Sequence, residues 1–154
     1  MKKYFLVLIT FLCIFTLTGC DEEEEKNPTS IPSELQGIYK GEKYTSGAEK
    51  YTGITYYYVY SVENNIIKRK ICSVGNYDNA EDIKKECNFD DGKTGLYQTH
   101  TYDVKDIEWK YRPNENIFFN MYEGDKKYAE CYTNFGSISC TTNEDDYLRW
   151  SKKD

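Results

Sequence analysis

The chain has 154 residues, of which 20 are basic and 26 acidic, so its formal net charge is −6. This length fits one domain and not two. The acidic balance excludes a nucleic-acid-binding protein, because neutralising phosphates requires clustered Lys and Arg. The 16 tyrosines and 7 phenylalanines favour pleated sheet over helix.

The first twenty residues are arranged as an export signal. Lys2 and Lys3 precede an almost entirely apolar run over residues 4–15, which is too short to span a bilayer comfortably. The end of this segment, Leu17-Thr18-Gly19-Cys20, resembles the lipobox of bacterial lipoproteins. The resemblance implies that residues 1–19 are a signal peptide and that Cys20 carries acyl chains such as palmitate. An uncleaved anchor is the alternative.

Residues 20–34 follow as an acidic segment. Asp21 and four glutamates are succeeded by two prolines and almost no apolar side chains, so the segment cannot bury enough surface to offset its ordering entropy. We expect a disordered, lipidated tether of at most ~45 Å. Such acidic residues resemble a surface-export signal in some bacteria, whereas Asp next to the lipid cysteine resembles an inner-membrane retention signal in others. A cell-envelope location follows, with the outer membrane or cell surface favoured.

Residues 35–151 are predicted to form one all-β domain. Short runs of β-forming residues alternate with turn signals, and the only helical candidate is residues 80–87. Residues 106–112 alternate as a half-buried antiparallel strand does, whereas either face of residues 117–122 could point inward. We expect a small antiparallel β-barrel, a meander of about eight strands, because closure removes exposed edges.

The clearest hairpin turns at Asn64-Asn65, a pair that suits a tight turn. This turn places Tyr60 opposite Arg69, Tyr58 opposite Ile71 and Val62 opposite Ile67. The face with these residues is expected to be the inner one. The alternate, more polar face is expected to be the outer one and consists of Thr55, Tyr57, Val59, Ser61, Glu63, Ile66, Lys68, Lys70 and Cys72.

Of the six cysteines, Cys13 leaves with the signal, and an even number in an exported domain predicts two disulfides. If residues 135–136 form a two-residue turn, the second pair faces across a non-hydrogen-bonded position, where side chains are closest. The first pair follows by elimination. A four-thiolate zinc site is the alternative, but the sequence lacks a Cys-x-x-Cys pair. The predicted disulfides are Cys72–Cys87 and Cys131–Cys140.

The two ends of the predicted domain together resemble the lipocalin-like pattern. Its opening sequence, Gly37-Ile38-Tyr39, matches a first strand that carries Gly-x-Trp, with Tyr39 in the place of Trp. Its closing sequence, Tyr147-Leu148-Arg149-Trp150, supplies a late Arg. The resemblance implies an antiparallel barrel in which Arg149 stacks on the ring of Tyr39.

The sequence offers no evident catalytic set. His100 is the only histidine, and there is no Gly-x-Ser-x-Gly nucleophile turn. The acidic clusters at 90–92 and 143–146 lie in predicted turns and lack the spacing of a calcium-binding loop. We therefore expect neither an enzyme nor a metal or cofactor.

The aromatic stripe carries the functional prediction. Tyr58, Tyr60 and Trp109 are candidate ligand-binding residues, although the stripe, which includes Tyr56, could simply fill the barrel. We expect a monomeric, membrane-anchored, non-catalytic binding module for a protein or glycan. One alternative is an inhibitor of a cationic, lysozyme-type wall-degrading enzyme, using residues 46–51 as an inserting loop. The other is a lipocalin-like carrier of a small apolar ligand.

Overall fold

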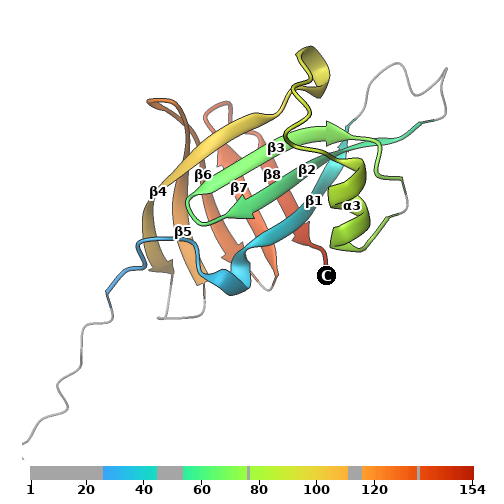
Figure 1. Ribbon diagram of the computed structural model, residues 1–154. Coiled ribbons are helices and arrows are strands. Elements are labelled where there is room, and N and C mark those ends of the chain that lie inside the picture. Colours follow the sequence, from blue (N-terminus) through green and yellow to red (C-terminus); the bar gives the residue numbers. More distant parts are fainter. Residues whose placement is uncertain (1–25, 45–53, 76, 111–115, 135) are drawn as a thin grey trace, which may run out of the picture.

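The computed structural model describes residues 26–44, 54–75, 77–110, 116–134 and 136–154. Eight antiparallel strands form a closed barrel in sequence order, with β8 paired to β1 (Figure 1). The predicted fold class is thereby confirmed. The strands are β1 (Gly37–Tyr44), β2 (Tyr56–Glu63), β3 (Ile66–Cys72), β4 (His100–Lys110), β5 (Asn116–Glu123), β6 (Lys126–Asn134), β7 (Ser137–Thr142) and β8 (Tyr147–Lys152).

The described part of the chain also contains three short helices, and none of these is long and apolar enough to cross a membrane. They are η1 (Ser33–Leu35), α3 (Ala80–Glu86) and η2 (Gly95–Tyr97). The predicted helix is confirmed as α3, whose first turn is capped by the side chain of Asn79 accepting a hydrogen bond from the backbone N–H of Asp82.

The predicted strand registers are confirmed. Tyr60 pairs with Arg69 and Tyr58 with Ile71 across β2 and β3, and the turn residue Asn64 has a φ of 51°, which Asn tolerates better than most residues. Both predicted disulfides, Cys72–Cys87 and Cys131–Cys140, are present.

The barrel core resolves the facing of β5, which the sequence left open. Ile117, Phe119 and Met121 point inward and are fully buried. Strand β4 is longer than the sequence indicated, and its register shifts between Lys105 and Glu108. The remaining residues of the main core are Ile31, Tyr39, Tyr60, Val62, Ile67, Tyr102, Val104, Ile107, Ala129, Cys131, Ile138, Cys140 and Trp150.

The expected outer face of the β2–β3 hairpin is not solvent-exposed throughout. Val59 is fully buried and Lys70 is only 3% exposed. The cause is the segment closed by the Cys72–Cys87 bond, which folds back over the barrel and packs Ile83 of α3 into a second core with Val59. Figure 1 shows α3 on the outside of the barrel beside β1–β3. We call residues 73–97 the lobe.

The expected disordered tether is partly folded. Ile31 is 1% exposed and belongs to the barrel core. The backbone N–H of Trp109 donates to the side chain of Asn27, and the side chain of Asn65 donates to the carbonyl of Thr29. Residues 27–35 thus pack on one end of the barrel because one apolar anchor and several edge hydrogen bonds offset their ordering. We call this the N-terminal end.

The opposite end, which we call the distal end, contains the β5–β6 turn and the β7–β8 loop. Strands β2, β4, β6 and β8 begin there, because the barrel is antiparallel. All described core side chains lie between Ile31 and Trp150. We therefore expect residues 26–154 to fold without the segment before them.

Candidate functional site

The three aromatic residues predicted to bind a ligand do not form one site. Tyr60 is 1% exposed, and its ring stacks on Trp150 with centroids 3.7 Å apart. Tyr58 lies nearer the distal end, where it contacts Tyr44 edge-on. Trp109 comes near the end of β4 and so belongs to the N-terminal end of the barrel. Tyr60 therefore serves the core, and only Tyr58 remains near a candidate site.

The guanidinium of Arg69 is a charged group inside the barrel, on the face that the sequence assigned to the interior but without a functional role. Its Cζ atom lies 5.6 Å from the ring centroids of Tyr58 and Tyr102 and 5.5 Å from that of Tyr128. Its Nη1 donates a 2.6 Å hydrogen bond to the Tyr128 hydroxyl. Among the described residues, no carboxylate lies within 4.0 Å of it. We call Arg69, Tyr58, Tyr102 and Tyr128 the arginine cage.

The electrostatics of the cage keep Arg69 charged and Tyr58 and Tyr102 neutral. Burial lowers the pKa of Arg69, but the neighbouring tyrosines outweigh this effect and leave the pKa above its ordinary value. Burial raises the pKa of Tyr102, and the charge of Arg69 offsets only part of that shift. The pKa of Tyr58 is raised by burial in the same way. The Tyr58 and Tyr102 hydroxyls therefore keep their protons near neutral pH.

The cage has more hydrogen-bond donors than acceptors. A guanidinium has five N–H donors, and among the described residues the Arg69 side chain uses one, toward Tyr128. The Tyr102 hydroxyl is buried, and among the described residues it makes no hydrogen bond of ordinary geometry, although besides burial the nearby Tyr128 hydroxyl contributes to raising its pKa. Since the Tyr128 oxygen accepts from Arg69, its own proton is available for another acceptor.

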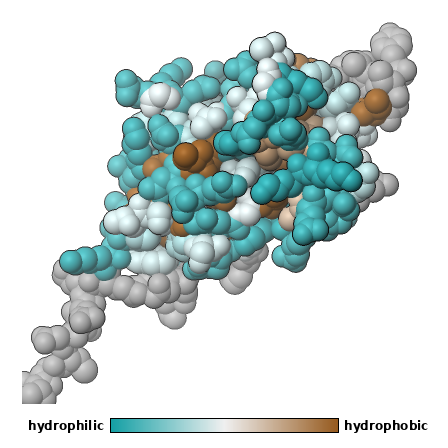
Figure 2. All heavy atoms as spheres, in the orientation of Figure 1, coloured by the Kyte–Doolittle hydropathy of each residue, from teal (hydrophilic) through white to brown (hydrophobic). Residues whose placement is uncertain are grey.

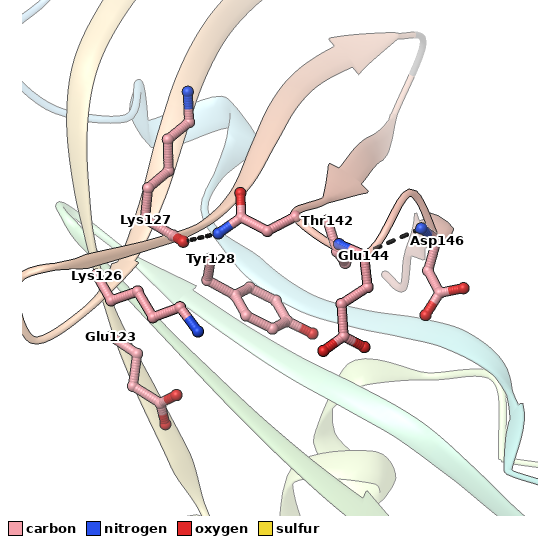
Figure 3. Close-up of a pocket in the computed structure, with 8 residues that line it drawn as sticks. Glu123, Lys126, Lys127, Tyr128, Thr142, Glu144 and Asp146 are labelled. Carbon is pink, nitrogen blue, oxygen red and sulfur yellow. Dashed lines mark hydrogen bonds between the residues drawn. The ribbon is translucent and has the colours of Figure 1, made fainter.

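A pocket of about 300 Å³ opens at the distal end and shares Tyr128 with the cage. Figure 3 shows the Lys126 ammonium, the Glu144 carboxylate and the Tyr128 ring turned toward the same space, while the Lys127 side chain points away. The pocket is lined by Glu123, Lys126, Lys127, Tyr128, Thr142, Asn143, Glu144 and Asp146.

The wall of this distal pocket is held by local hydrogen bonds. The backbone N–H of Asn143 donates to the carbonyl of Tyr128 over 3.1 Å, and its side chain donates to the carbonyl of Lys127. The hydroxyl of Thr142 accepts from the backbone N–H of Asp146 over 3.2 Å. These bonds join the β7–β8 loop to β6, so the pocket is built into the fold.

At the rim, the structure gives His100 a carboxylate neighbour. Its Nδ1 lies 3.2 Å from Glu123, and its ring stacks on Tyr102 at 6.5 Å. Within the described ranges, no group of three or more His, Cys, Asp or Glu side chains is placed to hold a metal ion.

A second pocket, of about 420 Å³, lies between the lobe and β3. Lys70 crosses this region, pairs with Asp91 and donates to the carbonyl of Asn88. The hydrogen bond from Lys70 lowers the pKa of Asp91 to about 2. Both charged groups of this contact are thus partnered, and we interpret it as the fastening of the lobe.

The predicted stacking of Arg149 on Tyr39 is wrong. Tyr39 is fully buried and its hydroxyl donates to the carbonyl of Leu35 over 2.6 Å. Arg149 is exposed, because it alternates with the inward-facing Trp150 along β8. The residue that closes the core from this strand is therefore Trp150.

Cys20 and the proposed inserting loop at residues 46–51 lie outside the described residues. On the face drawn in Figure 2, hydrophobic residues appear as small separate areas among hydrophilic ones. Comparisons with protein-family models, with curated proteins and with solved structures found no match.

Proposed function

We propose that this protein is a lipid-anchored bacterial lipoprotein and that its barrel is a non-catalytic binding module with the distal end as its binding face. The lipobox-like sequence ending in Cys20 supports the anchor. The arginine cage beneath the distal pocket supports binding, and it is the observation that carries the proposal.

The energetic cost of partly burying Arg69 supports a binding role for the cage. Removing a cation from water is costly unless its charge and its hydrogen bonds are met. Cation–π contacts with tyrosine faces offset part of this cost, at about 0.5–1 kcal/mol each in exposed sites and about 2 kcal/mol when desolvated. Arg69 is half-buried, and among the described residues only one of its N–H donors has a protein acceptor. An incompletely partnered cation is a departure from the apolar filling of a packed barrel. Departures of this kind are typical of functional sites.

The position of the anchor fits this orientation. Cys20 precedes the first described residue, Lys26, by only five intervening residues, which span at most ~18 Å. Residues 27–35 pack on the N-terminal end. A lipidated Cys20 would therefore hold that end toward the membrane and leave the distal pocket facing solvent.

Two measurements test the proposal. Cys20→Ala should move the protein from the membrane fraction to the soluble fraction. A thermal-shift screen of residues 26–154 against soluble metabolites and glycans should give ligands whose effect is lost in Tyr128→Ala. It should be retained in Tyr77→Ala, a change of an exposed tyrosine in the lobe. Ligands that stabilise Tyr128→Ala as much as the unchanged protein would show that the binding face lies elsewhere.

A lipocalin-like carrier is the second candidate function. The position of Tyr128 favours it, because this residue both lines the distal pocket and accepts a hydrogen bond from Arg69. A carrier would hold its ligand reversibly inside the barrel, and the charge of Arg69 makes a purely apolar ligand a poor match.

A further inference from the structure

If the distal end is the binding face as proposed above, the chemistry of the arginine cage restricts the chemical class of its ligand. Arg69 and the hydroxyls of Tyr102 and Tyr128 converge inside the barrel with unused donors. No described carboxylate lies within 4.0 Å of the Arg69 guanidinium, and Glu123, which lies near Tyr102, is paired with His100. The group that complements convergent donors around a fixed positive charge is an oxyanion.

We propose that the distal end binds a small, soluble organic anion. Its carboxylate, sulfonate or phosphate group accepts hydrogen bonds from Arg69, Tyr102 and Tyr128. Its apolar body lies against the tyrosine rings and in the distal pocket, whose volume of about 300 Å³ fits a ligand of two or three rings. The planar guanidinium fork matches the two oxygens of such a group.

The rim of the pocket limits the charge of the ligand. Glu123, Glu144 and Asp146 line it, whereas of its two lysines Lys126 turns toward the pocket and Lys127 points away (Figure 3), so acidic side chains predominate at the rim. A polyanion would meet repulsion from these carboxylates before it reached Arg69. A ligand with a single anionic group, followed by an uncharged body, avoids most of this cost.

The depth of the cage favours a soluble ligand over a lipid in a bilayer. Arg69 is half-buried inside the barrel, and its hydrogen bond to Tyr128 links it to the lining of the pocket. A headgroup that remains in a membrane plane cannot enter the barrel to that depth. The proposed anchor also holds the opposite end toward the membrane.

Two dyes that differ by one group test the inference. 8-Anilinonaphthalene-1-sulfonate carries the anion, and N-phenyl-1-naphthylamine is the same body without it. Titrated into residues 26–154 and followed by fluorescence, the sulfonate should bind at least about tenfold more tightly. Arg69→Gln should remove this preference and leave the affinity for the neutral dye unchanged.

A second variant guards against misfolding of Arg69→Gln. Tyr102→Phe removes a buried hydroxyl that makes no hydrogen bond of ordinary geometry among the described residues, so it should fold normally and weaken the sulfonate about three- to tenfold. Tyr39→Phe is the matched control, since its hydroxyl bonds Leu35 toward the N-terminal end, and it should leave the affinity for both dyes unchanged.

The outcomes separate the two proposals. Equal affinity for the two dyes would refute the proposal that the ligand is an anion, and so would a sulfonate affinity that is unchanged in Arg69→Gln and Tyr102→Phe. Neither result would refute the proposal that the barrel is a binding module. No binding of either dye would overturn both. Monomeric dodecanoate should displace the sulfonate, and phosphatidylglycerol vesicles should not. If vesicles displaced the sulfonate and dodecanoate did not, the proposal of a soluble ligand would be refuted.

Discussion

Arg69 on β3 donates a 2.6 Å hydrogen bond to the hydroxyl of Tyr128 on β6, 59 positions away in the sequence. The two strands are not neighbours, because β4 and β5 lie between them in the barrel. The bond therefore crosses the interior and joins two walls of the barrel near its distal end. A residue used this way both braces the barrel and presents a positive charge to whatever enters.

The first prediction concerns the balance between stability and binding at Arg69. Arg69→Met removes a half-buried cation and keeps an unbranched side chain of moderate size. Replacing buried charges with apolar residues is often neutral or stabilising, so we expect the free energy of unfolding in urea to change by less than about 1 kcal/mol. A loss of several kcal/mol would identify Arg69 as a structural residue.

The second prediction tests which residue of β8 closes the core. Trp150 is 1% exposed and stacks on Tyr60, so Trp150→Ala should lower the free energy of unfolding by about 3–5 kcal/mol. Its exposed neighbour is the control: Arg149→Ala should change it by no more than about 0.5 kcal/mol. Comparable losses in the two variants would restore the packing role that the lipocalin-like pattern assigned to Arg149.

The third prediction concerns acid stability. The pKa of Asp91 is about 2 in the folded protein, chiefly because of its hydrogen bond from Lys70, and its ordinary value is 3.8. The folded state thus binds the proton less readily than the unfolded state. Stability from this contact is complete above pH 3.8 and is lost as the pH falls through about 2.

Urea midpoints measured at pH 5, 3 and 2 provide the check. The decline with acidification should be shallower in Asp91→Asn than in the unchanged protein. Asp90→Asn, which alters the neighbouring and more exposed pair with Lys68, should leave the slope unchanged. Parallel slopes in all three proteins would show that Asp91 does not fasten the lobe through its charge.

The fourth prediction concerns the pairing of the cysteines and the contribution of Cys131–Cys140 to stability. Peptide mapping without reduction should give Cys72–Cys87 and Cys131–Cys140. Replacing both Cys131 and Cys140 with Ser should cost about 2–3 kcal/mol, because a closed loop of about ten residues restricts the unfolded chain. A crossed pair such as Cys72–Cys131 would contradict the strand registers.

Local rules made much of the fold predictable. A turn at Asn64 or after Asn134 determines every pair along its hairpin, because side chains alternate strictly along a strand. The same alternation misjudged Lys70, whose polar face is covered by the lobe and by the carboxylate of Asp91. The pattern of one hairpin carries no information about a segment that folds over it later.

The site was less predictable than the fold. Arg69, Tyr102 and Tyr128 come from β3, β4 and β6, and they meet only when the barrel closes. The available signal was a cation on the face assigned to the interior, opposite Tyr60. An inward-facing Arg among tyrosines needs a hydrogen-bonding or anionic partner. A search for that partner would have identified this end of the barrel as a candidate site.

The most direct test is a crystal structure of residues 26–154 with 8-anilinonaphthalene-1-sulfonate bound. We expect sulfonate oxygens within hydrogen-bonding distance of the Arg69 guanidinium and of the Tyr102 or Tyr128 hydroxyl, with the rings in the distal pocket. Dye bound at the lobe, or Arg69 paired with a carboxylate of its own chain, would contradict this expectation.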